Sequence, residues 1–259
     1  MKNPTRSLAD ALAELTQRAQ LLGVSLEPAQ LDRLSLFLDE LAAYNQHTNM
    51  VARADPWTLV HDHVLDSLTL VPCIERTQAE RKLVDIGSGA GFPGLVLALS
   101  VPDLEVVLSE SIAKKARFLE AVISRLSLFP RVQVRNDRAE SLGREPGMRG
   151  CFGLATARAV GTIDLVAELA LPMLNRNGWL LAQKSLRQLP DERRRLERAL
   201  PILGAQLREV VSPDVEAVGK ERAILIIEKI EPTSDRYPRS TSQIKARPLG
   251  ASPPGKHSS

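Results

Sequence analysis

Cysteine is scarce in this chain of 259 residues, which contains only Cys73 and Cys151. Neither cysteine has a second cysteine or a histidine at the spacing of a zinc site, so we expect no metal. An intracellular enzyme of this size rarely needs a disulfide, and we expect both thiols to be reduced. The sequence therefore argues against a disulfide-stabilised scaffold and against a zinc-centred fold.

Long apolar runs are missing as well. No stretch of about 18 or more apolar residues occurs, so the sequence offers no transmembrane helix. The first residues lack the apolar segment that a secretory signal needs. We therefore expect a cytoplasmic protein with no membrane partner.

Most of the chain also lacks an excess of charge of one sign. The net charge is +3, which argues only weakly for a nucleic-acid partner. Residues 232–259 contain five Lys and Arg against Asp235 alone, a local charge of +4, so the other 231 residues carry about −1. The same segment is rich in Pro, Ser and Gly without periodicity, which predicts a basic flexible tail.

Helical periodicity dominates the beginning of the chain. Apolar residues recur every three to four positions over 8–22 and 31–41, as on one face of a helix. The Asp-Pro pair at 55–56 predicts the start of a third helix ending near Val71, because the carboxylate caps free amides and proline fits the first turn. Residues 1–79 are therefore expected to form an N-terminal helical region.

From residue 80 the pattern changes to short apolar runs that alternate with helical stretches, as in βαβ units. The alternation predicts an α/β domain over 80–231, with helices on both faces of a sheet. Further helices are expected between the first five strands and at Pro190–Leu200. The expected strands are Lys82–Ile86, Leu104–Ser109, Val132–Arg135, Phe152–Ala157, Trp179–Gln183, Gln206–Val211 and Ala223–Lys229.

The densest motif runs from Leu83 to Gly94 and reads LVDIGSGAGFPG. An apolar strand leads directly into a loop in which glycines let the backbone approach a ligand closely and the amides of a following helix point outward. This combination predicts a binding site for a cofactor with a nucleotide part.

Two cofactors fit this loop. The stretch from Gly89 to Gly94 satisfies the spacing G-x-G-x-x-G, and Glu110 follows about twenty residues later, as a NAD-binding fold requires. Asp85 argues against NAD, because a charge at the end of a buried strand is costly without a partner. The ammonium group of S-adenosylmethionine is such a partner, and Glu110 would then hold the ribose hydroxyls. The residues favour a methyltransferase, while a NAD-dependent oxidoreductase and a purely structural glycine turn stay open.

Short motifs along nearly the whole chain resemble one family. They are, in order, Tyr44-Asn45, Asn49, His63-Val64-Leu65-Asp66-Ser67, Asp85 to Gly94, Lys114, Arg117-Phe118-Leu119, Arg138-Ala139-Glu140, Ala157-Arg158-Ala159, Lys184, Glu221-Arg222 and Tyr237-Pro238-Arg239. In order and spacing they resemble the bacterial glucose-inhibited division protein B family, the small-subunit rRNA guanine-N7 methyltransferases (RsmG). The resemblance implies a Rossmann-like class I S-adenosylmethionine-dependent methyltransferase sheet with an N-terminal helical extension.

The cofactor site is expected at the carboxyl ends of the first strands. The resemblance implies contacts with S-adenosylmethionine at Gly87, Phe92, Ala139, Glu140 and Arg158. The glycine loop and the acid after the second strand add Asp85, Gly89, Gly91 and Glu110.

The resemblance also implies the substrate, a guanine in 16S rRNA of the small ribosomal subunit. Guanine N7 carries a lone pair and no hydrogen, so we expect no general base; catalysis would come from holding N7 in line with the methyl group and excluding water. His63, Asp66 and Ser67 share one helix face. Together with Arg158 and Lys184 we expect His63 and Asp66 beside the site.

A ribosomal substrate requires phosphate contacts from Lys and Arg. The candidates are Lys114, Lys115, Arg117, Lys184, Arg222 and Arg239. We expect a monomer. A methyltransferase for another RNA or for a protein, and a non-catalytic RNA-binding protein, are the remaining alternatives beside the oxidoreductase.

Overall fold

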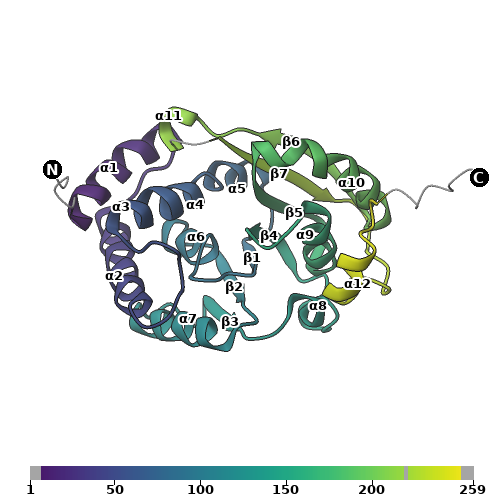
Figure 1. Cartoon of the computed structure of the whole chain (residues 1–259), viewed down its shortest axis with the longest axis horizontal. Helices are drawn as coiled ribbons and strands as arrows, with labels where there is room; N and C mark the ends of the chain where they lie inside the picture. Colours follow the sequence, from purple (N-terminus) through teal and green to yellow (C-terminus); the bar gives the residue numbers. More distant parts are fainter. Residues whose placement is uncertain (1–6, 219–220, 252–259) are drawn as a thin grey trace, which may run out of the picture.

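A mixed seven-stranded sheet with helices on both faces forms the centre of the molecule (Figure 1). The computed structural model describes residues 7–218 and 221–251. The strand order is β3-β2-β1-β4-β5-β7-β6; the first five strands are parallel and β7 is antiparallel to both neighbours. The predicted α/β class and all seven predicted strand positions are confirmed. The strands are β1 Lys82–Ile86, β2 Glu105–Ser109, β3 Val132–Arg135, β4 Phe152–Arg158, β5 Leu174–Ser185, β6 Ala205–Val211 and β7 Arg222–Lys229.

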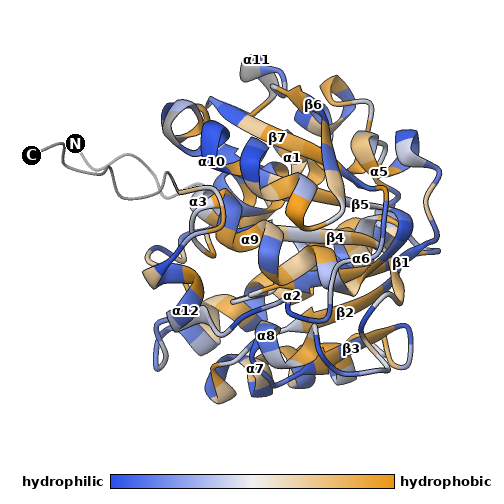
Figure 2. Cartoon of the chain, turned by 90° about the vertical axis from the view of Figure 1, so that its right-hand side faces the viewer, coloured by the Kyte–Doolittle hydropathy of each residue, from blue (hydrophilic) through white to orange (hydrophobic). Residues whose placement is uncertain are grey.

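Alternate residues of the central strands enter two hydrophobic cores, one on each side of the sheet. In β1, Leu83 belongs to one core and Val84 to the other. Apolar residues at successive positions of a strand therefore fit between two helix layers, as parallel sheets require. Figure 2 shows hydrophobic residues on the strands and polar residues on the outer sides of the helices.

One layer of helices covers each face of the sheet and contributes to one of the two hydrophobic cores. Helices α6 (Gly94–Ser100) and α7 (Ala113–Arg125) contact β1, β2 and β3. Helices α9 (Ile163–Ala170) and α10 (Leu189–Ile202) contact the strands on the opposite side, and α8 (Ala139–Leu142) lies next to α9. Within the described residues, no helix combines the length and the apolar character needed to span a bilayer.

The N-terminal helices pack onto the layer that contains α6 and α7. Helix α1 spans Leu8–Leu21 and α2 spans Pro28–Asn45. The apolar face of α2, including Phe37 and Leu41, lies in the same core as the residues of α6. The predicted helical region therefore shares its hydrophobic core with the sheet.

The third predicted helix, from Asp55 to Val71, is not one α-helix. It consists of α3 (Pro56–Thr58), a π-helical segment (Leu59–Leu65) and α4 (Asp66–Leu68), and α5 (Val71–Thr77) follows. Asp55 caps the start as predicted, through its contact with the amide of Thr58. Apolar periodicity does not register the extra residue per turn of a π-helix, a geometry that recurs at functional sites.

The C-terminal segment differs from the predicted flexible tail. Residues 232–251 fold back onto the sheet domain and contain α12 (Thr241–Ala246), while 252–259 lie outside the described residues. Arg149 donates to the carbonyls of Thr233 and Tyr237 at 2.6 and 2.8 Å. The composition is typical of disorder, but guanidinium groups elsewhere in the chain bind its backbone.

Candidate active site

The loop between β1 and α6 is built around glycines that a larger residue would disturb. Gly87 has φ +68°, a conformation that L side chains rarely adopt, and a Cβ there would lie 2.9 Å from Cγ2 of Val160. A Cβ on Gly94 would lie 2.7 Å from the Asp85 carboxylate. The bare backbone at these two positions lets the loop turn tightly over the end of β1.

Asp85 is fully buried beneath this loop. Its Oδ2 accepts from the amide of Gly94 at 3.1 Å and its Oδ1 accepts from the hydroxyl of Thr156 at 3.0 Å. Burial raises the pKa of Asp85 to about 6, although these hydrogen bonds and the nearby Arg158 act in the opposite direction. The carboxylate therefore stabilises the loop through its hydrogen bond with Gly94. A direct contact between Asp85 and the ammonium group of the cofactor stays a prediction.

Glu110 follows β2 and holds the same loop from the other side. Its Oε2 accepts from the amide of Gly89 at 2.9 Å, and its Oε1 accepts from the amide of Ile112 at 2.7 Å. The side chain is almost fully buried. Glu110 therefore ties the glycine loop to the start of α7.

Two cavities open at the carboxyl ends of the strands, and Gly87 lines both of them. The larger has a volume of about 1120 Å³ and the smaller about 210 Å³. Predicted site residues that line the larger cavity are Gly89, Phe92, His63, Asp66, Arg158, Lys184, Lys115 and Arg222. Ala139 and Glu140 line the smaller one. The structure thus brings most of the predicted residues around two adjoining cavities.

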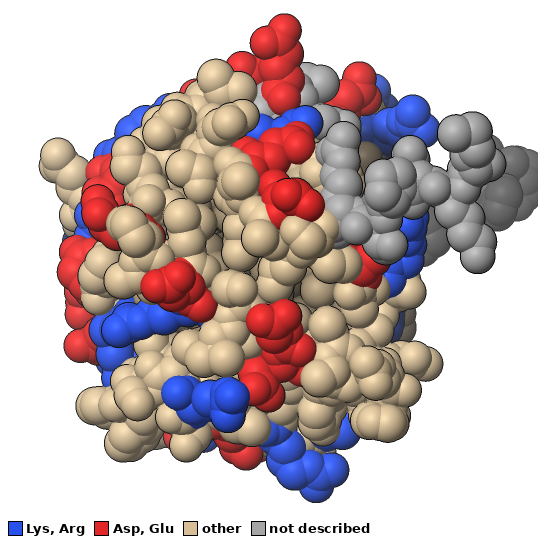
Figure 3. All heavy atoms as spheres, turned by 90° about the vertical axis from the view of Figure 1, so that its left-hand side faces the viewer, with Lys and Arg blue, Asp and Glu red and all other residues tan. Residues whose placement is uncertain are grey.

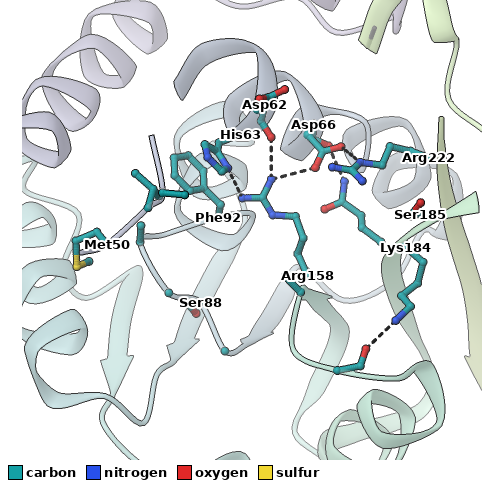
Figure 4. Close-up of a pocket in the computed structure, with 18 of the residues that line it drawn as sticks. Met50, Asp62, His63, Asp66, Ser88, Phe92, Arg158, Lys184, Ser185 and Arg222 are labelled. Carbon is teal, nitrogen blue, oxygen red and sulfur yellow. Dashed lines mark hydrogen bonds and ion pairs between the residues drawn. The ribbon is translucent and has the colours of Figure 1, made fainter. Parts of the chain in front are cut away.

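Arg158 stands at the centre of the larger cavity (Figure 4). Its guanidinium lies 5.2 Å from the centre of the Phe92 ring and donates to Oδ2 of Asp66 at 3.0 Å. It also lies 3.0 Å from Nδ1 of His63, whose ring stacks on Phe92 at 4.8 Å. The guanidinium is thereby held by the helical region on one side and by the glycine loop on the other.

Asp66 is the anchor of this arrangement. It is fully buried and accepts from Arg158 at 3.0 Å and from Arg222 at 2.9 Å. Its backbone carbonyl accepts from Nε2 of Gln183 at 2.6 Å. Ser67, in contrast, donates its hydroxyl to the His63 carbonyl within its own helix. Of the predicted helix face, His63 and Asp66 reach the cavity.

Lys184 is only slightly exposed at the end of β5. Its Nζ donates to the carbonyl of Gly161 at 2.7 Å and forms an ion pair with Glu192 at 2.9 Å. This side chain, predicted to contact phosphate, therefore holds the loop after β4 against α10.

The remaining RNA candidates divide into two groups. Lys115 lines the larger cavity, and Lys114 and Arg117 are exposed on the same helix, α7. Arg239 differs from the prediction, because its guanidinium forms a fork-like pair with the fully buried Glu168, at 2.8 and 2.6 Å.

On the face that carries α1 and α2, acidic and basic side chains are interspersed (Figure 3).

Several residues around the two cavities are not among the predicted site residues. Thr156 lies beside Asp85 because β4 pairs with β1 in that register, and a polar residue in a buried strand was the available signal. Arg53 lines the larger cavity, and Thr241 and Lys245 line the smaller one. Within the described residues there is no group of three or more His, Cys, Asp or Glu suited to a metal ion.

The fold is that of a class of methyltransferases. The chain is similar to the structure of an O-methyltransferase from Bacillus cereus in complex with SAH, with a TM-score of 0.52, 18% identity, and coverage of 75% of this chain and 90% of that one. At this identity the likeness concerns the fold alone.

The family follows from the sequence comparisons. The family model for rRNA small subunit methyltransferase G (GidB) matches residues 30–222. Ribosomal RNA small subunit methyltransferase G of Desulfitobacterium hafniense is 35% identical over 93% of this chain and 97% of its own length. The protein of the same name from Chloroflexus aggregans is 40% identical over 88% of this chain and 93% of its own length.

The chain therefore belongs to the rRNA small subunit methyltransferase G family. It is an S-adenosylmethionine-dependent rRNA methyltransferase, and the resemblance inferred from the short motifs is confirmed. The NAD-dependent alternative is excluded.

Proposed function

We propose that this protein transfers the methyl group of S-adenosylmethionine to N7 of one guanine in 16S rRNA. The observation that carries the proposal is the meeting of two cavities at Gly87, a residue whose bare backbone permits close approach. The smaller cavity suits the adenosine of the cofactor. The larger one has room for its methionine end together with a target base.

The residues around the cavities fit this cofactor. Ala139 and Glu140 would contact the adenosine, and Glu110, which accepts from the amide of Gly89, would bind the ribose hydroxyls. Phe92 and Arg158 would flank the methionine end. When bound, the cofactor supplies an electrophilic methyl group on a sulfonium.

Two carboxylates that line the larger cavity favour an acceptor atom that carries a lone pair and no hydrogen, because each of them is paired with a cation. Asp66 is engaged with Arg158 and Arg222, and Glu192 with Lys184, so these carboxylates are held as partners of cations. Guanine N7 needs no proton removed during the transfer. The chain would accelerate the reaction by holding the base in line and excluding water.

The substrate would reach the larger cavity along its basic rim. Arg53 and Lys115 line the cavity, and Lys114 and Arg117 lie on the adjoining helix. Such cations bind phosphates and position RNA without reading its sequence. Both cavities are formed within one chain, which supports a monomer as the active unit. A ribosomal substrate would place the protein in the cytoplasm.

The proposal is tested by transfer of a radiolabelled methyl group to 16S rRNA in vitro, followed by borohydride reduction and aniline-catalysed chain scission, which cleaves RNA selectively at N7-methylguanine. We expect the label at one guanine, and an unchanged rate for Arg208→Gln, which removes a surface ion pair with Glu228. Label that resists N7-specific cleavage, or label in protein, would contradict the assigned target atom.

A further inference from the structure

The smaller cavity has a wall that comes from the end of the chain. Its lining comes from strand ends, from the loops that follow them and from α8 and α9, but Thr241 and Lys245 also line it. Both belong to α12, which lies beside α8 and α9 (Figure 1). The family model ends at residue 222, so it does not include this segment.

The segment before α12 is fixed by a buried ion pair. Arg239 binds the fully buried Glu168 of α9 through Nε, Nη2 and its backbone amide, at 2.8, 2.6 and 2.9 Å. Arg144 donates to the carbonyl of Pro238 at 2.9 Å. A buried carboxylate needs its cation, so these contacts hold the segment in one place.

Helix α12 is then oriented by its own caps and by one apolar anchor. Ser240 and Gln243 form a capping box at its start. Ile244 is buried in the core on the side of α9. Thr241 and Lys245 are four residues apart and therefore share a helix face, which is the face that lines the smaller cavity.

Glu140 connects this face to the predicted cofactor site. Its Oε1 accepts from Arg138 at 2.9 Å and from the amide of Thr241 at 3.4 Å. The lining of this cavity combines polar side chains (Asp137, Glu140 and Lys245) with apolar ones that include Leu165 and Leu169. A flat, apolar purine ring with polar edges suits such a cavity.

We propose that α12 is the outer wall of the adenosine site, with Thr241 and the stem and ammonium of Lys245 in contact with the adenosine of S-adenosylmethionine. The inference rests on the proposed assignment of the smaller cavity to adenosine. It makes the C-terminal segment part of the cofactor site, so that cofactor affinity depends on residues beyond the sheet.

Isothermal titration with S-adenosylhomocysteine and with methylthioadenosine, which lacks the amino-acid end, tests the proposal. For Lys245→Ala we expect both dissociation constants to rise by a similar factor, about three- to tenfold, as for the loss of one partly exposed polar contact. Lys245→Met, which keeps most of the stem, should show a smaller rise. Ala246→Ser, on an exposed position of the same helix, should stay within about twofold of the wild type.

The outcomes separate this inference from the proposed function. Unchanged affinities for Lys245→Ala and Thr241→Val would overturn the role of α12, as would a loss confined to S-adenosylhomocysteine. A lower thermal midpoint with unchanged affinity would also overturn it, because the helix would then be only structural. A wild-type protein that binds neither ligand would contradict the cofactor assignment itself.

Discussion

Single buried carboxylates hold the functional site together. Asp85 fixes the glycine loop through Gly94 and Thr156, and Asp66 fixes Arg158 and Arg222 at the larger cavity. Both side chains are fully buried. A buried carboxylate is unfavourable unless hydrogen bonds or cations compensate it, so each of these residues links its own position to that of its partners.

Asp85 makes stability depend on pH. Its pKa rises from the ordinary 3.8 to about 6 in the folded protein. The stabilisation from its protonated form is present below about pH 4 and is lost as the pH rises through 6, because the unfolded chain releases that proton earlier. Asp85→Asn cannot ionise; its amide oxygen can accept from the Gly94 amide, and its NH2 group can donate to the Thr156 hydroxyl. Relative to this variant, the wild type should lose about 3 kcal/mol of unfolding free energy between pH 3 and pH 7.

Urea unfolding of both proteins across this pH range measures the effect. Because groups other than Asp85 titrate in both proteins, the difference between the two unfolding free energies isolates the contribution of the Asp85 carboxyl group. Parallel stability curves would show that Asp85 titrates near its ordinary pKa in the folded protein.

Asp66 should matter for both stability and transfer. Asp66→Asn leaves two guanidinium groups without their carboxylate, and we expect a loss of about 2–3 kcal/mol, below the range for a fully buried pair because both arginines are partly exposed. We also expect slower methyl transfer, because Arg158 loses its anchor. As a matched control, Asp103→Asn removes an exposed ion pair with Arg81 and should cost less than about 1 kcal/mol. Equal effects of the two changes, measured by denaturation and kcat, would refute the anchoring role.

At the scale of elements, local patterns predicted the sheet because each strand carries its own signal. Lys82–Ile86 is rich in apolar residues and leads into Gly87, and Val132–Arg135 alternates apolar and polar residues after Pro130; both strands have these bounds in the structure. The glycine loop was equally visible. Thr156 was not, because its contact with Asp85 depends on how two strands 71 positions apart are paired.

The structure differs from the prediction at the third predicted helix and in the C-terminal segment, because neither feature has a local sequence signal. Periodicity separates helix from strand but not an α-helix from the π-helical segment Leu59–Leu65. Composition suggested a flexible tail over residues 232–259, whereas the position of residues 232–251 is set by distant partners such as Glu168 and Arg149. Contacts of this kind are properties of the folded chain and leave no local pattern.

The C-terminal segment should detach when its ion pair is broken. Arg239→Gln leaves Glu168 buried without a cation, and we expect a loss of about 3 kcal/mol. Hydrogen exchange should rise over 232–251 more than in β1. The double change Arg239→Met with Glu168→Met removes both charges and should recover part of the stability. If Arg239→Gln raised hydrogen exchange equally across the chain, this result would contradict the prediction that the ion pair holds residues 232–251 in place.

At the scale of the whole molecule, the site forms where three parts of the chain meet. The helical region contributes Asp66, the sheet contributes the glycine loop and Arg158, and the C-terminal segment contributes Lys245. The net charge of +3 is small, and the basic side chains proposed for RNA lie at the cavity and on α7. We therefore expect RNA to be positioned by the cations around the cavity, with a small contribution from long-range attraction by a uniformly basic surface.

The measurement that tests the central claim most directly maps N7-methylguanine along 16S rRNA from cells with and without this protein. We predict that one modified guanine loses its methyl group when the protein is absent and regains it when the wild-type gene is restored. An identical modification map in the two RNAs would contradict the claim.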